Sequence, residues 1–85
     1  MQSAIELSTE NDTNRLPILG YGSSSDAVRV LQWLLFCQHY YSDRIDGIFA
    51  LGTEEAVKSF QKDQGLTVDG IVGPKTWLAL SKIYL

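Results

Sequence analysis

A short pattern occurs twice in this 85-residue chain and constrains its fold more than any other feature. The first copy runs from Ile45-Asp46-Gly47 to Thr53 and beyond, and the second runs from Val68-Asp69-Gly70 to Thr76 and beyond. Corresponding residues keep the same spacing, since Asp46 lies as far before Asp69 as Thr53 lies before Thr76. One small fold must therefore accommodate the same local structure twice.

Each copy is typical of a tight turn followed by the start of a helix. Glycine takes positive φ in such a turn, and aspartate bonds to its own backbone. We therefore expect Asp46 and Asp69 to cap their own turns, with ligand or cation binding as the alternative. The apolar pairs that follow, Ile48-Phe49 and Ile71-Val72, are expected to enter a core. Pro74 suits the first residue of a helix, because the missing N–H costs nothing there.

Apolar periodicity predicts three helices, near residues 26–39, 52–64 and 74–82. Ser25 or Asp26 can cap the first helix, and Gly65 supplies a left-handed residue past the end of the second. The apolar positions of the three helices are, in order, Val28, Leu31 and Leu35; Ala56, Val57 and Phe60; Trp77, Leu78 and Leu80. No helix is long enough to be stable alone. The predicted fold is therefore all-α, a compact three-helix bundle with two repeated Asp-Gly loop and helix-start units.

Length and composition exclude several classes of protein. The chain allows one domain, expected over residues 16–85, after a polar segment 1–15 that is expected to be a mobile tail or linker. Cys37 is the single cysteine and cannot form an internal disulfide. No stretch approaches the ~20 apolar residues of a membrane span, and the N-terminus lacks a signal-peptide pattern. The net charge of -3 argues against a nucleic-acid partner.

The motifs in their order resemble the peptidoglycan-binding-like domain, the small three-helix module attached to many bacterial cell-wall hydrolases. The resemblance covers about Leu16 to Leu80. It rests on Val28-Arg29-Val30-Leu31-Gln32 with Leu35, Tyr40-Tyr41, the two Asp-Gly units, Phe60-Gln61 and Gly65-Leu66. It implies a non-catalytic module that binds peptidoglycan and targets an attached or partner hydrolase. The location would then be the cell wall or another extracytoplasmic site, if the chain is part of an exported protein.

The chain departs from the family pattern at three places. Ala50-Leu51-Gly52 stands where the family usually has Gly-Pro-Lys, whereas Gly73-Pro74-Lys75 keeps that pattern. Ser25 replaces a frequent glycine before the first helix, and His39 replaces a frequent glycine at its end. We therefore expect a different local geometry in the first loop.

Candidate ligand-binding residues gather between the first two helices: Tyr40, Tyr41, Arg44, Asp46 and Phe49. Aromatic rings stack on sugar faces, while tyrosine hydroxyls and arginine bond to peptide carbonyls and carboxylates. This combination suits a glycan with a peptide stem. The alternative is that Tyr41 and Phe49 belong to the core, which leaves Tyr40 and Arg44 as the exposed pair.

The sequence offers no catalytic set, metal site or cofactor site. Cys37 and His39 point away from each other on a helix, and a metal needs several convergent ligands. Gln32 and Gln61 are expected to satisfy backbone groups of the loops. Thr53 and Thr76 are expected to bond to backbone at the helix starts. An enzyme is therefore unsupported, and the alternative to peptidoglycan binding is a protein-interaction or autoinhibitory module on the same fold.

The first helix carries a second apolar face. Val30, Trp33 and Cys37 recur at i, i+3 and i+7, opposite the core positions. The resembled family usually has charged residues at the positions of Val30, Trp33 and Phe36. A helix that is apolar nearly all round is normally covered on both sides. We therefore predict a contact surface centred on Trp33, for self-association or for docking a neighbouring domain; scattered surface apolar residues are the alternative.

Overall fold

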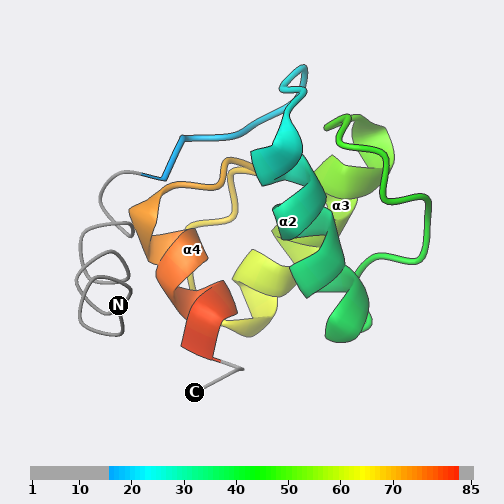
Figure 1. The fold of residues 1–85 in the computed structure, drawn as a ribbon. Coiled ribbons are helices and arrows are strands. Elements are labelled where there is room, and N and C mark those ends of the chain that lie inside the picture. Colours follow the sequence, from blue (N-terminus) through cyan, green and yellow to red (C-terminus); the bar gives the residue numbers. More distant parts are fainter. Residues whose placement is uncertain (1–15, 83–85) are drawn as a thin grey trace, which may run out of the picture.

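A computed structural model describes residues 16–82 and contains three helices: α2 (Asp26–Cys37), α3 (Leu51–Asp63) and α4 (Pro74–Ser81). In Figure 1, α3 lies behind α2 and α4 lies to one side of it. The described residues contain no strand, only two isolated antiparallel bridges. The predicted three-helix bundle is confirmed, and the predicted tail 1–15 falls outside the described residues.

The segment before α2 lies along both Asp-Gly loops and joins them. Leu19 exchanges two backbone hydrogen bonds with Val72 of the second loop, at 3.1 and 2.8 Å. Farther along, the N–H of Gly22 donates to the carbonyl of Phe49 in the first loop, and the N–H of Phe49 donates to the carbonyl of Ser23, both at 2.9 Å. One extended segment therefore fixes the two loops relative to each other.

The ends of α2 follow from its capping residues. Ser25 is the N-cap, and its Oγ accepts a hydrogen bond from the N–H of Val28. The helix ends at Cys37, earlier than predicted, because His39 takes a φ of 69°. The N–H of His39 bonds to the carbonyl of Phe36, as in other helix ends with a left-handed residue. A histidine therefore holds the conformation for which glycine is favoured.

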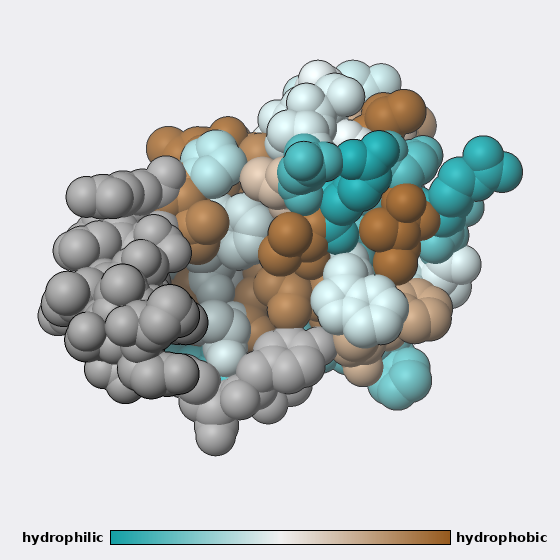
Figure 2. Space-filling model, in the orientation of Figure 1, coloured by the Kyte–Doolittle hydropathy of each residue, from teal (hydrophilic) through white to brown (hydrophobic). Residues whose placement is uncertain are grey.

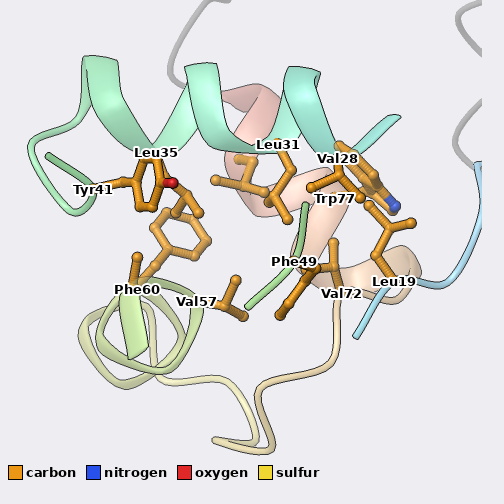
Figure 3. Close-up of a cluster of buried hydrophobic side chains, with 12 residues drawn as sticks. Leu19, Val28, Leu31, Leu35, Tyr41, Phe49, Val57, Phe60, Val72 and Trp77 are labelled. Atoms are coloured by element: carbon orange, nitrogen blue, oxygen red, sulfur yellow. The ribbon is translucent and has the colours of Figure 1, made fainter. Parts of the chain in front are cut away.

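The core lies between the three helices and receives one residue from each loop. The predicted stripe of Val28, Leu31 and Leu35 is fully buried on α2 (Figure 3). Phe49 and Val72 enter the same core, whereas Ile48 and Ile71 are 53% and 46% exposed. The expectation that both apolar residues of each loop enter the core is wrong. The two residues after each turn point to opposite sides, as successive residues of an extended chain do, so only the second of them faces the core.

Trp77 of α4 ties that helix to the segment before α2. Its side chain is 4% exposed and lies near Val28 and Leu19 (Figure 3). Its Nε1–H donates to the carbonyl of Pro17 at 2.9 Å, so the polar end of the buried ring is satisfied. Leu78, the next residue, is exposed.

Candidate ligand-binding site

A buried glutamine from α2 holds the first Asp-Gly loop. The Oε1 of Gln32 accepts from the N–H of Gly47 at 2.9 Å. Its Nε2 donates to the carbonyl of Ile48 and to the Oγ1 of Thr53, both at 3.0 Å. The Oδ1 of Asp46 lies 3.2 Å from the same nitrogen. A single amide therefore joins the turn, the residue after it and the first turn of α3.

Gln61 of α3 does the same for the second loop. Its Oε1 accepts from the N–H groups of Asp69 and Gly70, at 3.1 and 3.0 Å. Its Nε2 donates to the carbonyl of Ile71 at 2.9 Å and lies 3.2 Å from the Oγ1 of Thr76. The expected role of both glutamines is confirmed. We call each arrangement a glutamine clasp.

The predicted hydrogen-bond partner of Thr53 and Thr76, the backbone at the helix starts, is wrong. The hydroxyls of Thr53 and Thr76 accept from the glutamine amides, and neither α3 nor α4 has a side-chain hydrogen bond at its N-cap. The sequence contains a signal for the glutamine–threonine hydrogen bond. In both units a glutamine in one helix is followed by an Asp-Gly turn and then by a threonine at the start of the next helix.

Asp46 and Asp69 cap their own turns, as predicted. The Oδ1 of Asp46 accepts from the N–H of Ile48, and the Oδ1 of Asp69 accepts from the N–H of Ile71, both at 2.9 Å. These backbone bonds, helped by the glutamine amides, lower the pKa of both carboxyl groups. The carboxylates are therefore held in their charged form by the loops themselves.

These lowered pKa values predict that acid destabilises the fold. A carboxyl whose folded pKa lies below its unfolded value of about 3.9 stabilises the fold above that value. The contribution is lost as the pH falls through the folded pKa. Because Asp69 is exposed and Asp46 is only half-buried, we expect a modest effect, measured by urea unfolding between about pH 5 and pH 2.

The matched control for this experiment is Asp46→Asn combined with Asp69→Asn. An asparagine Oδ1 accepts the same turn hydrogen bond but does not titrate. We therefore expect the double variant to lose less stability than the wild type over that pH range. Equal losses in the two proteins would contradict the assignment, because every other carboxyl group is shared.

A groove of about 490 Å³, here called the first-loop groove, lies between residues 40–43, which precede the first loop, and α3; a different groove, of about 560 Å³, lies beside the second loop. The first-loop groove is lined by Tyr40, Tyr41, Ser42, Asp43, Gly52, Glu55, Ala56 and Ser59. The hydroxyl of Tyr40 donates to Asp63 at 2.7 Å, and its ring packs edge-on against Phe60. Tyr40 is thus held at the groove by both ends of its side chain.

The other predicted site residues are divided between the surface and the core. Tyr41 is 7% exposed and lines the groove with one edge, while its hydroxyl donates to the carbonyl of Arg44. Arg44 is exposed but does not line the groove, and Asp46 is half-buried. Phe49 is 1% exposed, so its ring is not available to stack on a ligand. The structure brings Tyr40 and Tyr41 together at the groove and leaves Arg44 beside them.

Sequence reasoning missed the groove beside the second loop. This second-loop groove has apolar walls from Ile18, Leu66 and Ile71, and Lys75 lies at its edge at the start of α4. The other lining residues are Gln61, Gly65, Thr67, Asp69, Gly73, Pro74 and Thr76. The internal repeat was only a partial signal, because the two grooves share three equivalent lining positions: Ser42 and Gly65, Asp43 and Leu66, Gly52 and Lys75.

Within residues 16–82, no three His, Cys, Asp or Glu side chains lie close enough to hold a metal ion. None of the helices described there is long and apolar enough to cross a membrane.

Comparison with known protein families gives one match over most of the described residues. The model described as "Putative peptidoglycan binding domain" matches residues 24–80. The matched segment contains both Asp-Gly loops and both glutamine clasps.

Curated relatives are longer than this chain. A spore cortex-lytic enzyme of Bacillus cereus is 37% identical over 83 residues, which is 96% of this chain and 31% of the enzyme. The N-acetylmuramoyl-L-alanine amidase CwlM of Mycobacterium tuberculosis is 42% identical over 55 residues, which is 65% of this chain and 14% of the amidase. This chain is therefore similar to a minor part of each relative.

Solved structures with the same fold include the N-terminal domain of SleB. It superposes with a TM-score of 0.77 at 37% identity, over 79% of this chain and 92% of that domain. The endolysin of Burkholderia phage AP3 has a TM-score of 0.73 at 40% identity, over 76% of this chain and 25% of the endolysin.

Proposed function

We propose that this chain, which belongs to the peptidoglycan-binding domain family, binds bacterial peptidoglycan without cleaving it. The observation that carries the proposal is the family match over residues 24–80, which spans both loops and their clasps. The chain would hold an attached or partner cell-wall hydrolase close to its polymer by raising the effective concentration. Its place of action would be the cell wall, as part of an exported protein.

The absence of a catalytic role is supported by how the polar groups are used. The capping oxygens of Asp46 and Asp69 are engaged by backbone N–H groups, so neither carboxylate is poised as a general acid or base. The buried amides of Gln32 and Gln61 are engaged within the clasps. The polar groups around the loops therefore stabilise the fold, which is consistent with a binding role and not with catalysis.

The grooves supply the surfaces for a ligand with sugar and peptide parts. Tyr40 lines the first-loop groove, and Arg44, which is exposed outside it, can pair with a carboxylate of a stem peptide. At the second-loop groove, Lys75 offers the cation beside apolar walls. We assign the main contact to the first-loop groove, because Tyr40 and Tyr41 line it together; its charged lining residues are Asp43 and Glu55, and Arg44 lies outside it.

Sedimentation with purified insoluble peptidoglycan tests the function. We expect the chain to cosediment and to release no soluble glycan or peptide fragments from the same sample. A chain that stays in the supernatant would instead favour a protein-interaction or autoinhibitory module. Released fragments would show that the chain cleaves the polymer.

Substitutions then locate the contact. We expect Tyr40→Ala combined with Arg44→Ala to weaken cosedimentation by about tenfold, the value of one charge-assisted hydrogen bond. The control is Ile18→Ala combined with Lys75→Ala, which changes the second-loop groove by the same number of side chains. If only the control variant loses binding, the ligand occupies the second-loop groove. Circular dichroism must show that both variants are folded.

A further inference from the structure

Two apolar surface features lie outside the core and the clasps. One is the predicted contact surface on α2, where Val30 and Trp33 are both 52% exposed and Cys37 is half-buried. The rings of Trp33 and Phe36 stack there, with centroids 5.8 Å apart. None of residues 16–82 covers Trp33, and the contact surface on α2 stays a prediction. The other feature is the second-loop groove, whose lining carries more information about its occupant.

The lining of the second-loop groove combines aliphatic walls with one cation. Ile18 and Ile71, which form walls together with Leu66, are 69% and 46% exposed. In Figure 2, brown apolar residues gather at the upper left, where Figure 1 shows the segment before α2 passing the start of α4. Lys75 is the only basic residue among those that line the groove, and Asp69 has its Oδ1 engaged by its own turn. The groove therefore favours an occupant with aliphatic side chains and a negative charge.

The groove also has polar groups that are available to an occupant. Lys75 is exposed in the first turn of α4, and within residues 16–82 the single ion pair joins Asp26 and Arg29. Among the same residues, neither the N–H nor the carbonyl of Thr67 has a backbone partner. An ammonium group and a free peptide unit beside apolar walls suit a short peptide with a carboxylate side chain.

One stretch of residues 1–15, which lie outside the described structure, has this chemistry. Between residues 2 and 15 the apolar side chains are Ala4, Ile5 and Leu7, and Glu6 lies between the last two. In an extended chain, Ile5 and Leu7 would point to one side and Glu6 to the other. Two aliphatic side chains could then contact the walls while the carboxylate faces Lys75 at the exposed side. We call residues 4–7 the 4–7 segment.

Chain connectivity brings the 4–7 segment to this groove. Ile18 forms a wall of the groove and lies three residues after Arg15. Residues 8–15, which join the 4–7 segment to the described chain, can span up to about 27 Å when extended. Over such a short connection the effective concentration of the segment at the groove is on the order of millimolar. Even a weak contact would therefore be occupied.

The first-loop groove does not suit the same segment. Its charged lining residues are Asp43 and Glu55, and none of its described lining residues is basic. Residues 2–14 carry the acidic side chains of Glu6, Glu10 and Asp12 and no basic one. Like charges would repel each other at the first-loop groove, whereas the second-loop groove offers a cation. Charge complementarity therefore selects the second-loop groove.

We propose that the second-loop groove is a peptide-binding groove whose occupant is the 4–7 segment of this chain. Ile5 and Leu7 contact the apolar walls, and Glu6 pairs with Lys75 at the exposed side. While the segment is bound, the second-loop groove is closed to other ligands, and the first-loop groove is the one open to a polymer. The inference concerns the chain alone and does not rest on the proposed function.

Amide chemical shifts of the full chain, measured without peptidoglycan, test the occupancy. In Ile5→Ser combined with Leu7→Ser, the amide signals of Gly65 and Thr67 should move, because the aliphatic side chains leave the groove. The signals of the first-loop groove should keep their positions. The matched control is Thr9→Ala combined with Asn11→Ala, two polar positions that the proposal leaves outside the groove, and it should leave the signals of both grooves unchanged. Circular dichroism must show that every variant is folded.

Charge reversal tests the pairing of Glu6 with Lys75. Glu6→Lys and Lys75→Glu should each move the signals of Gly65 and Thr67 toward their positions in the Ile5→Ser, Leu7→Ser variant, because like charges would then meet. The two reversals combined should bring these signals back toward the wild type. A role of either residue in the fold alone would give no such rescue.

Three results would overturn the proposal. The first is a second-loop groove whose signals do not respond to Ile5→Ser combined with Leu7→Ser. The second is a response centred on the first-loop groove or on α2, which would place the 4–7 segment there. The third is a combined charge reversal that restores nothing. Because no polymer is present in these measurements, failure of the proposed function leaves their outcome unchanged.

Discussion

Gln61→Leu is expected to lower the free energy of unfolding by about 3–5 kcal/mol, since each buried polar group left unsatisfied costs about 1–3 kcal/mol. Leucine has a similar size but cannot accept from the N–H groups of Asp69 and Gly70. It also cannot donate to the carbonyl of Ile71. For a domain of this size, such a loss is a large part of a total stability of about 5–15 kcal/mol.

Urea unfolding followed by circular dichroism measures this change. The matched control is Gln64→Leu, since Gln64 lies on the exposed end of the same helix and should change stability by about 0.5 kcal/mol or less. Equal stabilities of the two variants would contradict the clasp as a main support of the second loop.

Trp77→Ala is expected to lower the free energy of unfolding by a similar amount, about 3–5 kcal/mol. The substitution leaves a cavity beside Leu19 and Val28 (Figure 3), and the carbonyl of Pro17 loses its partner. It therefore weakens the contact of α4 with the segment before α2, and through that segment the arrangement of both loops.

The chain supplies its own control, because its second tryptophan is exposed. Trp33→Ala should cost about 0.5 kcal/mol or less when measured at a protein concentration too low for self-association. Thermal or urea unfolding of the two variants, side by side, gives the comparison. If Trp33→Ala were the more damaging substitution, the assignment of core and surface on these helices would be wrong.

Local chemistry made most of the helices predictable from the sequence. The stripe on α2, the capping by Ser25 and the turns at Asp46 and Asp69 depend on residues a few positions apart. Such short-range signals survive in a single sequence because backbone geometry and helical periodicity are the same in every fold. The end of α2 was misplaced because nothing local requires a histidine to take positive φ.

Contacts between distant residues were not predictable. The pairing of Leu19 with Val72 and of Gly22 with Phe49 joins segments that carry no mutual sequence signal. The exposure of Ile48 and Ile71 follows from that pairing, since it fixes which side of each loop faces the core. The sequence therefore predicted the two turns and their glutamine partners, but not the segment that pairs with them. The expected difference in the first loop is wrong, because Ala50 (φ -114°, ψ -163°) and Gly73 (φ -105°, ψ -167°) have nearly the same backbone conformation.

The candidate site was predictable only in part, for the same reason. Tyr40 lies at the first-loop groove, where the sequence suggested an aromatic contact, whereas Phe49 lies in the core. Both are aromatic residues near one turn, so composition does not distinguish them. The second-loop groove depends on Ile18, which is far from the loop in sequence and reaches it through the N-terminal segment.

The glutamine clasps have a consequence for how this domain can change over evolutionary time. Apart from the aspartate, the threonine and, for Gln32, the hydroxyl of Tyr41, each clasp contacts backbone atoms, including the carbonyl groups of Ile48 and Ile71. The side chains of these two isoleucines point outward and contribute nothing to the clasp. Both positions can therefore accept many residue types while the loop keeps its shape. The domain separates the residues that encode its architecture from two positions at which new recognition can be acquired by single substitutions.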